Sequence, residues 1–480
     1  MSTKDLPPPQ GERHVLAPEE ELRLEVPFAV RGSTSTVQLL LQQGSCELQG
    51  CELVSGKPVI ISDDGGLKIA LFTWHGCVLD VQTENVPVTI SYTSDETTSN
   101  VAAVNTHAQL EALRDEAAAA KTQGPRVLIV GPAESGKSSL CKVLTAYAVK
   151  LGRTPVVLDL DPADSAVSVA GTLAAVPITS REAVTAQSYA TAGLPAGTAS
   201  PLVMWHGSLT LQPDLFREQV TALGNKVNAR LQADEWARSS GMIVNTNGWI
   251  QDEGYQIILH AVQALGITVV LVVGHDRLYS MMKKDVGTAV KVIKVPRSGG
   301  VVSRDANYLR ACRSRSLKRY FYGDMLDAAP QASASSGGGG NNSNNNKAAA
   351  EPGTAKRVPQ LTPSLLQLPF KELTIYKFSS ISLSASLLPV AAAQATEHVQ
   401  FAPVEITDKL QHAVLAVCHP DAVAAYEQSG RAADLYCSGV AGFLTVERVL
   451  MDTEMVHLLS PCAGSLPSNT LIVGDITWME

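Results

Sequence analysis

The chain has 480 residues, of which 45% are hydrophobic, and its length predicts two or three domains that each have enough apolar material for a core. No apolar run approaches the ~20 residues that a membrane-spanning helix needs, and the polar, acidic first thirty residues do not resemble a secretory signal. The formal net charge of −8 argues against a protein that coats nucleic acid. The eight cysteines are scattered, with none in a C-x-x-C pair, which argues against a zinc site or disulfide framework and favours reduced thiols in the cytosol or nucleus.

The N-terminal part of the sequence alternates between apolar and polar residues in short runs. Examples are the runs at 22–26 and 68–72, and the pattern extends over residues 22–93 with glycine- and aspartate-rich breaks. This alternation predicts a small antiparallel β domain, similar to a β-sandwich, at residues 1–105. An alanine-rich segment at 106–122 predicts a helix that leads into the next domain.

Residues 131–138 read Gly-Pro-Ala-Glu-Ser-Gly-Lys-Ser and match the pattern G-x-x-x-x-G-K-[ST] at every fixed position. The apolar run at 126–130 predicts a strand before the motif, and the apolar spacing at 140–151 predicts a helix after it. In that context, backbone N–H groups surround phosphate oxygens, Lys137 reaches the β- and γ-phosphates, and the Ser138 hydroxyl binds Mg²⁺. The motif therefore predicts a nucleoside triphosphate site. The alternative is an ordinary glycine-rich turn before a helix.

Apolar runs and helical patterns alternate through the middle third of the chain. The predicted strands lie at 126–130, 156–160, 242–245 and 267–273. Strands that are apolar on both faces are typical of a parallel sheet covered by helices. The fold class is therefore α/β, with a central P-loop NTPase domain at residues 106–327. Ligands of such sheets bind at the carboxyl ends of the strands, where Gly131, Asp161 and Asn245 fall.

Asp161 ends the second of these strands, whose last residues read Leu-Asp-Leu-Asp at 158–161. On a P-loop sheet, a carboxylate at this position faces the Mg²⁺ and the incoming acceptor. Asp161 is therefore predicted to bind the metal or to accept the proton of an attacking hydroxyl. The alternative is a side chain that only caps the following turn.

Basic residues concentrate between Asp276 and Arg319, a stretch with twelve Lys or Arg against three Asp and thus a net charge of +9. A solvated helix face explains such a stretch as well as a basic wall facing phosphates does. Within it, residues 297–304 form a loop with two glycines between Arg297 and Arg304. That composition suits a lid closing over transferring phosphate. The alternative is a surface loop with incidental arginines.

A low-complexity segment with runs of glycine and asparagine occupies residues 328–360. It cannot bury enough apolar surface to order itself, so it predicts a disordered linker or a loop insertion. Residues 361–480 return to short apolar runs and turns. They predict a third, mostly-β domain.

Six segments, taken in order, resemble a known family. They are Phe-Thr-Trp-His-Gly-Cys at 72–77, Gly-Pro-Arg-Val at 124–127, the phosphate loop at 131–139, Asn-Thr-Asn-Gly-Trp at 245–249, Ser-Gly-Gly-Val-Val at 298–302 and Arg-Tyr-Phe-Tyr-Gly at 319–323. The series resembles the polynucleotide 5′-hydroxyl kinase family that includes a subunit of the pre-mRNA cleavage and polyadenylation complex. The P-loop alone does not select this family, whereas the ordered series does.

The resemblance implies that ATP and Mg²⁺ bind between the central and N-terminal domains. The residues implied to contact ATP are Glu21, Lys68, Glu134, Ser135, Gly136, Lys137, Ser138 and Ser139. Those implied to hold the metal are Ser138 and Asp161, and those implied in phosphoryl transfer are Lys137, Asp161, Arg297 and Arg304. Trp249 is implied to stack on an RNA end. Without the resemblance, Glu21 and Lys68 are expected to be exposed strand residues, and Trp249 a core tryptophan.

Two segments depart from the pattern of the family's active kinases. Residues 162–165 read Pro-Ala-Asp-Ser, whereas the pattern of the active kinases at this place resembles V-G-Q-G. The proline stiffens the turn, and Asp164 adds a negative charge. Residues 250–255 read Ile-Gln-Asp-Glu-Gly-Tyr, whereas the pattern of the active kinases at this place resembles V-K-G-x-G-Y. Relative to that pattern, this chain loses one cation and gains two carboxylates. Carboxylates beside the groove that holds the RNA repel the phosphates of its backbone. The departures bear on phosphoryl transfer rather than on ATP binding.

Two functions are compatible with these residues, and both can hold at once. In the first, the chain is an ATP-binding subunit of the nuclear pre-mRNA cleavage complex and is required for cleavage in polyadenylation-dependent 3′-end formation. It binds a scaffold subunit, and ATP acts as a structural cofactor. In the second, it is a kinase that transfers the γ-phosphate of ATP to the 5′-hydroxyl ends of RNA. An unrelated GTPase is disfavoured, because no Asn-Lys-x-Asp-like segment follows the strand at 267–273.

Overall fold

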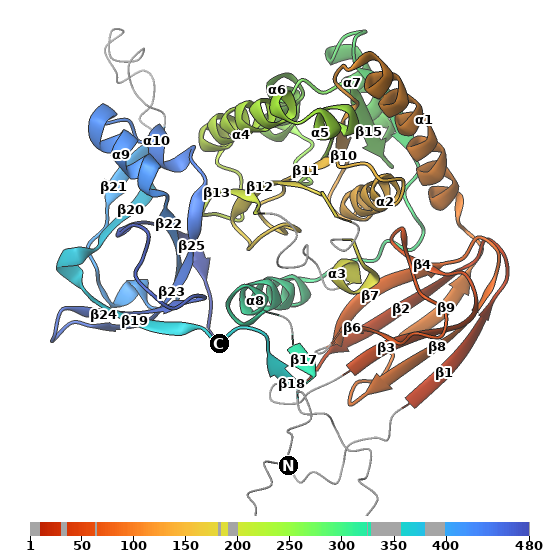
Figure 1. Cartoon of the computed structure of the whole chain (residues 1–480), viewed down its shortest axis with the longest axis horizontal. Coiled ribbons are helices and arrows are strands. Elements are labelled where there is room, and N and C mark those ends of the chain that lie inside the picture. Colours follow the sequence, from red (N-terminus) through yellow and green to blue (C-terminus); the bar gives the residue numbers. More distant parts are fainter. Residues whose placement is uncertain are drawn as a thin grey trace, which may run out of the picture.

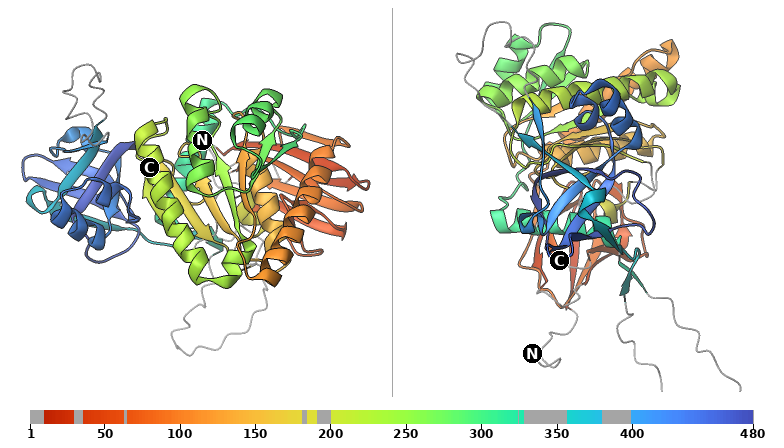
Figure 2. Two further views of the ribbon diagram at one scale, coloured as in Figure 1. Left: turned by 90° about the horizontal axis from the view of Figure 1, so that it is seen from above. Right: turned by 90° about the vertical axis from the view of Figure 1, so that its left-hand side faces the viewer.

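The structure is a computed structural model that describes residues 10–29, 36–62, 65–180, 184–190, 200–323, 325–327, 357–379 and 399–479. A central α/β region lies between an N-terminal and a C-terminal β region (Figures 1 and 2). This arrangement confirms the predicted fold class. Most of the predicted linker, residues 328–356, lies outside the described residues. Within the described ranges, no helix is long and apolar enough to cross a bilayer.

The N-terminal region is a β-sandwich of antiparallel sheets. In spatial order, the strands of one sheet are β1 (Gln10–Leu16), β8 (Cys77–Glu84), β3 (Thr36–Gly44) and β6 (Val59–Ser62). Those of the other sheet are β5 (Cys51–Glu52), β4 (Glu47–Leu48), β7 (Gly65–Phe72), β2 (Glu21–Phe28) and β9 (Ile90–Ser94). Buried residues such as Leu22 and Leu39 fill the core between the sheets. Glu21 and Arg23 lie on the face of β2 that points away from this core, and they are buried as well. They are buried because the central region lies against that face.

The central region is a sheet covered by helices. In spatial order, its strands are β13 (Leu202–Trp205), β12 (Thr172–Pro177), β11 (Val156–Leu160), β14 (Met242–Thr246), β10 (Arg126–Val130), β15 (Val269–Val273) and β16 (Lys291–Val295). The strands from β11 to β16 are parallel, as predicted, whereas β12 and β13 add antiparallel pairs at one edge. The helices are α1 (Thr98–Ala120), α2 (Lys137–Lys150), α3 (Ala186–Ala190), α4 (Pro213–Ala233), α5 (Glu235–Ser240), α6 (Asp252–Ala264), α7 (Asp276–Asp285) and α8 (Ala306–Tyr322).

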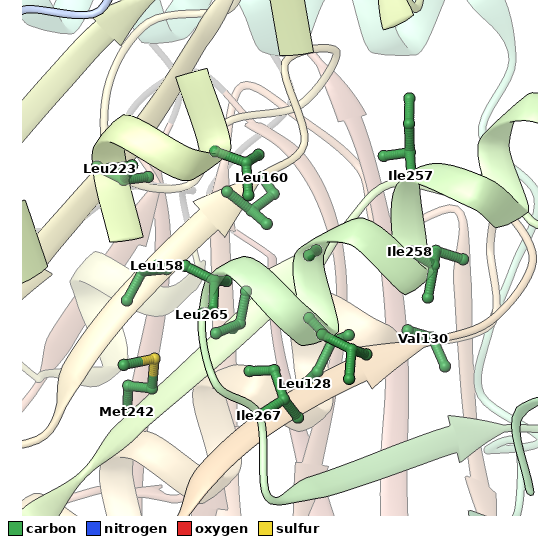
Figure 3. Packing of buried hydrophobic residues seen from close by; sticks show 14 of the residues in the cluster. Leu128, Val130, Leu158, Leu160, Leu223, Met242, Ile257, Ile258, Leu265 and Ile267 are labelled. Carbon is green, nitrogen blue, oxygen red and sulfur yellow. The ribbon is translucent and has the colours of Figure 1, made fainter. Parts of the chain in front are cut away.

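The core of this region fixes where the functional residues lie. On one face of the sheet, Leu128 and Leu158 belong to the same buried cluster as Leu223 of α4 and Ile258 of α6 (Figure 3). Helices α1 and α2 cover the other face. Because both faces are covered, the parallel strands are held side by side, and their carboxyl ends bring the phosphate loop and the turn after β11 together. Helix α1 begins earlier than the predicted residue 106.

The C-terminal region is a mixed sheet with short helices. In spatial order, its strands are β19 (Ser364–Pro369), β24 (Met455–Ser460), β23 (Val440–Leu450), β22 (Ala413–Cys418), β25 (Thr470–Thr477), β20 (Thr374–Ser379) and β21 (Gln400–Pro403). Its helices are α9 (Pro420–Ser429) and α10 (Ala433–Tyr436), with 3-10 turns at Phe370–Glu372 and Asp408–Leu410. Strand β17 (Met325–Asp327) pairs with β18 (Arg357–Pro359) beside helix α8. The region is mostly β, as predicted.

Phe321 of α8 joins the central and C-terminal regions through an aromatic contact. It is fully buried, and its ring stacks on that of Trp478 with the centroids 5.3 Å apart. Replacing Phe321 with alanine is expected to lower the free energy of unfolding by about 3–5 kcal/mol, because a cavity forms and the stacking is lost. Urea denaturation followed by circular dichroism measures the change. The control Trp236→Ala, at a side chain 73% exposed, is expected to change it by less than about 0.5 kcal/mol. Equal losses in the two variants would contradict this role of Phe321.

Candidate nucleotide site

The loop between β10 and α2 has a conformation that suits a phosphate site. Glu134 and Gly136 have φ angles of 55° and 93°, so the chain turns tightly before α2 begins at Lys137. A Cβ atom on Gly131 would lie 2.9 Å from the Ser135 hydroxyl oxygen and from a carbonyl oxygen of β15, so a side chain does not fit there. The Ser135 Oγ is buried and has no hydrogen-bond partner among the described residues. This hydroxyl and the backbone N–H groups of the loop are donors of the kind that phosphate oxygens accept.

A cavity of about 570 Å³ opens over this loop. Its walls come from β2 and β7 of the sandwich, from α1, from the turn after β11, from the residues after β14, and from the loop before α8. The predicted site residues that line it are Glu21, Lys68, Glu134, Ser135, Gly136, Lys137, Ser138, Ser139, Asp161, Trp249 and Arg304. Arg297 is exposed at the end of β16 and is not among the described lining residues. The fold thus brings together residues from distant parts of the chain, with Arg297 outside the group.

Lys137 lies at the floor of the cavity, where it is only 6% exposed. Its Nζ donates a hydrogen bond to the Pro132 carbonyl oxygen at 2.7 Å. Burial lowers the pKa of Lys137 to about 8, with Asp161 opposing this shift and Arg304 adding to it. A cation that is poorly solvated and held by a single carbonyl is well prepared to bind an anion.

The lowered pKa of Lys137 predicts that nucleotide binding depends on pH. Phosphate oxygens favour the protonated lysine, so binding above pH 8 requires the uptake of one proton. The affinity for Mg-ATP is therefore expected to fall as the pH rises, by up to about tenfold for each unit above 8. Titration calorimetry at pH 7 and pH 9 measures the fall, and Lys137→Ala is expected to lose it. Equal affinities of the unmodified protein at the two pH values would contradict this account.

Two aspartates, Asp159 of β11 and Asp161 of the following turn, lie near one another, and the charge of Asp161 acts on Lys137. The Asp159 carboxylate accepts hydrogen bonds from the Ala166 N–H at 2.6 Å, the Asp161 N–H at 3.1 Å and the Asn245 amide at 3.1 Å. Burial and the nearby charge of Asp161 raise the pKa of Asp159 to about 7. Asp161 itself accepts from the Ala163 N–H at 3.1 Å, and burial followed by the charge of Asp164 raises its pKa. Asp159 therefore supports the turn, while Asp161 faces the cavity.

The donor set at the loop fits a magnesium ion. Ser138 is the second residue of α2, and its hydroxyl donates to the Asn245 side-chain oxygen at 3.5 Å. Ser138 and Asp161 both line the cavity. Mg²⁺ is commonly bound by one or two protein oxygens together with substrate phosphates, and these two side chains supply oxygens of that kind.

The sandwich supplies a polar wall of the cavity. Glu21 is 4% exposed, and its carboxylate accepts from the Arg23 guanidinium at 2.7 Å and from the Asn100 amide at 3.2 Å. Lys68 donates to the Ser303 carbonyl oxygen at 3.0 Å and so ties the sandwich to the loop before α8. The position of Glu21 differs from the exposed strand residue that its local sequence alone predicts. The cause is the contact between regions, which buries the outer face of β2.

The loop before α8 lies against both the sandwich and the phosphate loop. The backbone N–H of Arg304 donates to the Glu134 carboxylate at 2.6 Å, and its guanidinium pairs with Asp164 at 2.7 Å. A Cβ atom on Gly300 would lie 2.9 Å from the Arg23 guanidinium, so the loop approaches β2 closely at this glycine. The loop therefore forms part of the cavity wall, and its action as a lid stays a prediction.

Trp249 lines the cavity and also packs on the protein interior. Its ring meets that of Phe216 nearly edge-on with the centroids 6.0 Å apart. Its backbone N–H donates to the Asn247 side-chain oxygen at 2.9 Å. A Cβ atom on Gly248 would lie 2.5 Å from the Ala133 nitrogen, so this segment touches the phosphate loop. Trp249 thus combines a partly buried ring with access to the cavity.

Sequence reasoning missed several residues that line the cavity. Asn100 of α1 has no local motif that would have identified it. Tyr308 and Arg313 of α8 line the cavity as well. Arg313 lies within the basic stretch at 276–319, and the positive charge of that stretch could have indicated that Arg313 faces the phosphates. The basic stretch therefore forms part of the cavity wall through α8, while Arg277 and Lys291 within it are exposed.

Three family descriptions match successive parts of the chain. Residues 15–117 match the N-terminal β-sandwich domain of polyadenylation factor, residues 131–323 match the mRNA cleavage and polyadenylation factor CLP1 P-loop, and residues 361–480 match pre-mRNA cleavage complex II protein Clp1. The matches cover all three regions of the fold.

Individual relatives are similar over nearly the whole chain. The polyribonucleotide 5′-hydroxyl-kinase Clp1 of Bos taurus is 32% identical over 464 residues, which is 96% of each chain. That of Danio rerio is 33% identical over 474 residues, covering 98% of this chain and 94% of its own. Among solved structures, Clp1p in a complex with Pcf11p superposes with a TM-score of 0.76 at 23% identity, covering 98% of this chain and 99% of that one. This last likeness shows a shared fold.

Proposed function

This chain belongs to the Clp1 family of pre-mRNA cleavage and polyadenylation factors, and from that premise we propose that it is the ATP-holding subunit of a nuclear pre-mRNA cleavage complex. The observation that carries the proposal is the cavity over the phosphate loop, which is walled by the sandwich, the central region and the loop before α8. Nucleotide in this cavity contacts both regions at once. The proposed contacts are the phosphate loop from Glu134 to Ser139, with Glu21 and Lys68 on the sandwich side.

Bound ATP would act as a structural cofactor. A ligand that binds only the folded form stabilises that form by mass action, by about 2.7 kcal/mol at a hundred times its dissociation constant. Lys137 would neutralise the phosphates, and Ser138 and Asp161 would hold Mg²⁺, which supplies further positive charge beside them. The resulting rigid pair of regions is a platform for a protein partner. The relative of solved structure is in a complex with Pcf11p, and we assign this chain a scaffold partner of the same kind.

The test of this function is cleavage of a pre-mRNA substrate that carries a polyadenylation site. A nuclear extract depleted of the protein is expected to lose cleavage and to regain it when the purified full chain is added back. Lys137→Ala is expected to restore cleavage only poorly, because the variant binds nucleotide more weakly. Full cleavage in the depleted extract would contradict the proposal.

A second function, RNA 5′-hydroxyl kinase, is favoured by the presence of Asp161, Trp249 and Arg304 in the same cavity as Lys137. In this reaction the 5′-hydroxyl oxygen attacks the γ-phosphorus, its proton passes to Asp161, the bond to the bridging oxygen breaks, and ADP leaves. Trp249 would stack on the terminal base. Transfer of labelled γ-phosphate to a 5′-hydroxyl RNA oligonucleotide tests this function. Transfer at equal rates by the protein and by Lys137→Ala would assign the activity to a contaminant.

A further inference from the structure

Arg304 and Asp164 form an ion pair at the rim of the nucleotide cavity. The guanidinium Nη1 lies 2.7 Å from a carboxylate oxygen, and the two side chains are 36% and 28% exposed. Asp164 belongs to the turn after β11, whereas Arg304 lies in the loop before α8, 140 positions later. Both residues line the cavity. The pair therefore joins the acceptor side of the site to its lid.

The turn that carries Asp164 is held firmly in place. The Asp161 carboxylate accepts from the Ala163 N–H at 3.1 Å, and the Pro162 carbonyl oxygen accepts from the Gly171 N–H at 2.7 Å. These bonds fix the backbone on both sides of the proline ring. Asp164 is therefore presented to the lid by a rigid turn rather than by a flexible one.

Arg304 is fixed on its other side by the phosphate loop. Its backbone N–H donates to the Glu134 carboxylate at 2.6 Å, so the base of the side chain stays beside the loop that receives the phosphates. The charge of Arg304 acts on both Lys137 and Asp161. Arg304 thus shares the cavity with Lys137 and Asp161, while the Nη1 of its guanidinium donates to Asp164.

We propose that Asp164 is a positioning residue that competes with the terminal phosphate of the nucleotide for Arg304. This inference rests on the proposed nucleotide site. A γ-phosphate reaches Arg304 only by displacing the Asp164 carboxylate, whereas ADP presents no group at that position. The ion pair therefore lowers the preference for ATP over ADP and keeps the lid arginine from the transferring group, so the site holds nucleotide with little turnover.

The proposal is tested by the preference of the full chain for ATP over ADP. After bound nucleotide has been removed, titration calorimetry with each nucleotide and Mg²⁺ gives the two affinities. Asp164→Asn is expected to raise the ratio of the two affinities about fivefold, the cost of breaking a partly exposed ion pair. Asp164→Glu keeps the charge and is expected to retain the original ratio. In an Arg304→Ala background, Asp164→Asn is expected to leave the ratio unchanged.

The outcomes separate this proposal from the one on which it rests. If the unmodified protein binds neither nucleotide, both proposals are overturned. If it binds them and Asp164→Asn leaves the ratio unchanged, only the role of Asp164 is overturned. The same rise in the Arg304→Ala background would also overturn it, because the effect would then be a general loss of negative charge near the phosphates.

Discussion

Replacing Lys137 with alanine is expected to weaken Mg-ATP binding by about 10- to 100-fold and any phosphoryl transfer by about 10²- to 10³-fold. Lys137 is 6% exposed at the floor of the cavity. Its charge is therefore little screened by water, and the phosphates that approach it lose a strong partner when it is removed. Titration calorimetry gives the affinity, and transfer to a 5′-hydroxyl RNA gives the rate.

Lys150→Ala is the matched control for this experiment. Lys150 lies at the other end of the same helix, α2, with its side chain 52% exposed, and it pairs with Glu52 of the sandwich. Its removal deletes the same charge from the same helix, and the affinity is expected to change by less than about twofold because surface ion pairs contribute little. A loss of affinity as large in Lys150→Ala as in Lys137→Ala would contradict a specific phosphate contact by Lys137.

Replacing Asp161 with asparagine is expected to lower phosphoryl transfer by about 10²- to 10⁴-fold while nucleotide remains bound. Asparagine keeps an oxygen that accepts the Ala163 N–H bond, so the turn is preserved. What is lost is a carboxylate whose pKa is raised by burial, and that rise makes it a better proton acceptor. The rate of transfer and the affinity for ATP are measured on the same preparation.

The control for Asp161 is Asp421→Asn, at a side chain 94% exposed in α9 of the C-terminal region. It is expected to leave both the rate and the affinity unchanged. Transfer by Asp161→Asn at the rate of the unmodified protein would remove Asp161 from the mechanism. Loss of ATP binding together with transfer would instead make Asp161 a nucleotide ligand rather than a base.

Local patterns predicted the parts of the site that neighbouring residues determine. The phosphate loop is specified by eight consecutive residues, and its strand and helix by their own apolar spacing, so its structure follows from sequence. Asp161 could be placed because it ends an apolar run. The antiparallel strands β12 and β13 were not predicted, since their pairing depends on the edge of a sheet that only the whole region defines.

Contacts between regions were beyond the reach of local patterns. Glu21 sits on an alternating strand, and alternation alone predicts an exposed side chain. Its burial arises because another region covers that face of β2. The pairing of Asp164 with Arg304 joins two loops far apart in sequence. The basic loop suggested two lid arginines, but only the folded chain shows that Arg304 lines the cavity while Arg297 is exposed.

Whether nucleotide joins the sandwich to the central region is tested most directly by two measurements. These are the nucleotide content of the purified full chain and its melting temperature before and after stripping. We expect about one adenine nucleotide per chain and a melting temperature that falls on stripping and recovers with Mg-ATP. Lys137→Ala is expected to be purified with less nucleotide and to need about 10- to 100-fold more Mg-ATP for the same recovery. A protein that carries no nucleotide and whose melting temperature does not respond to saturating Mg-ATP would contradict the account.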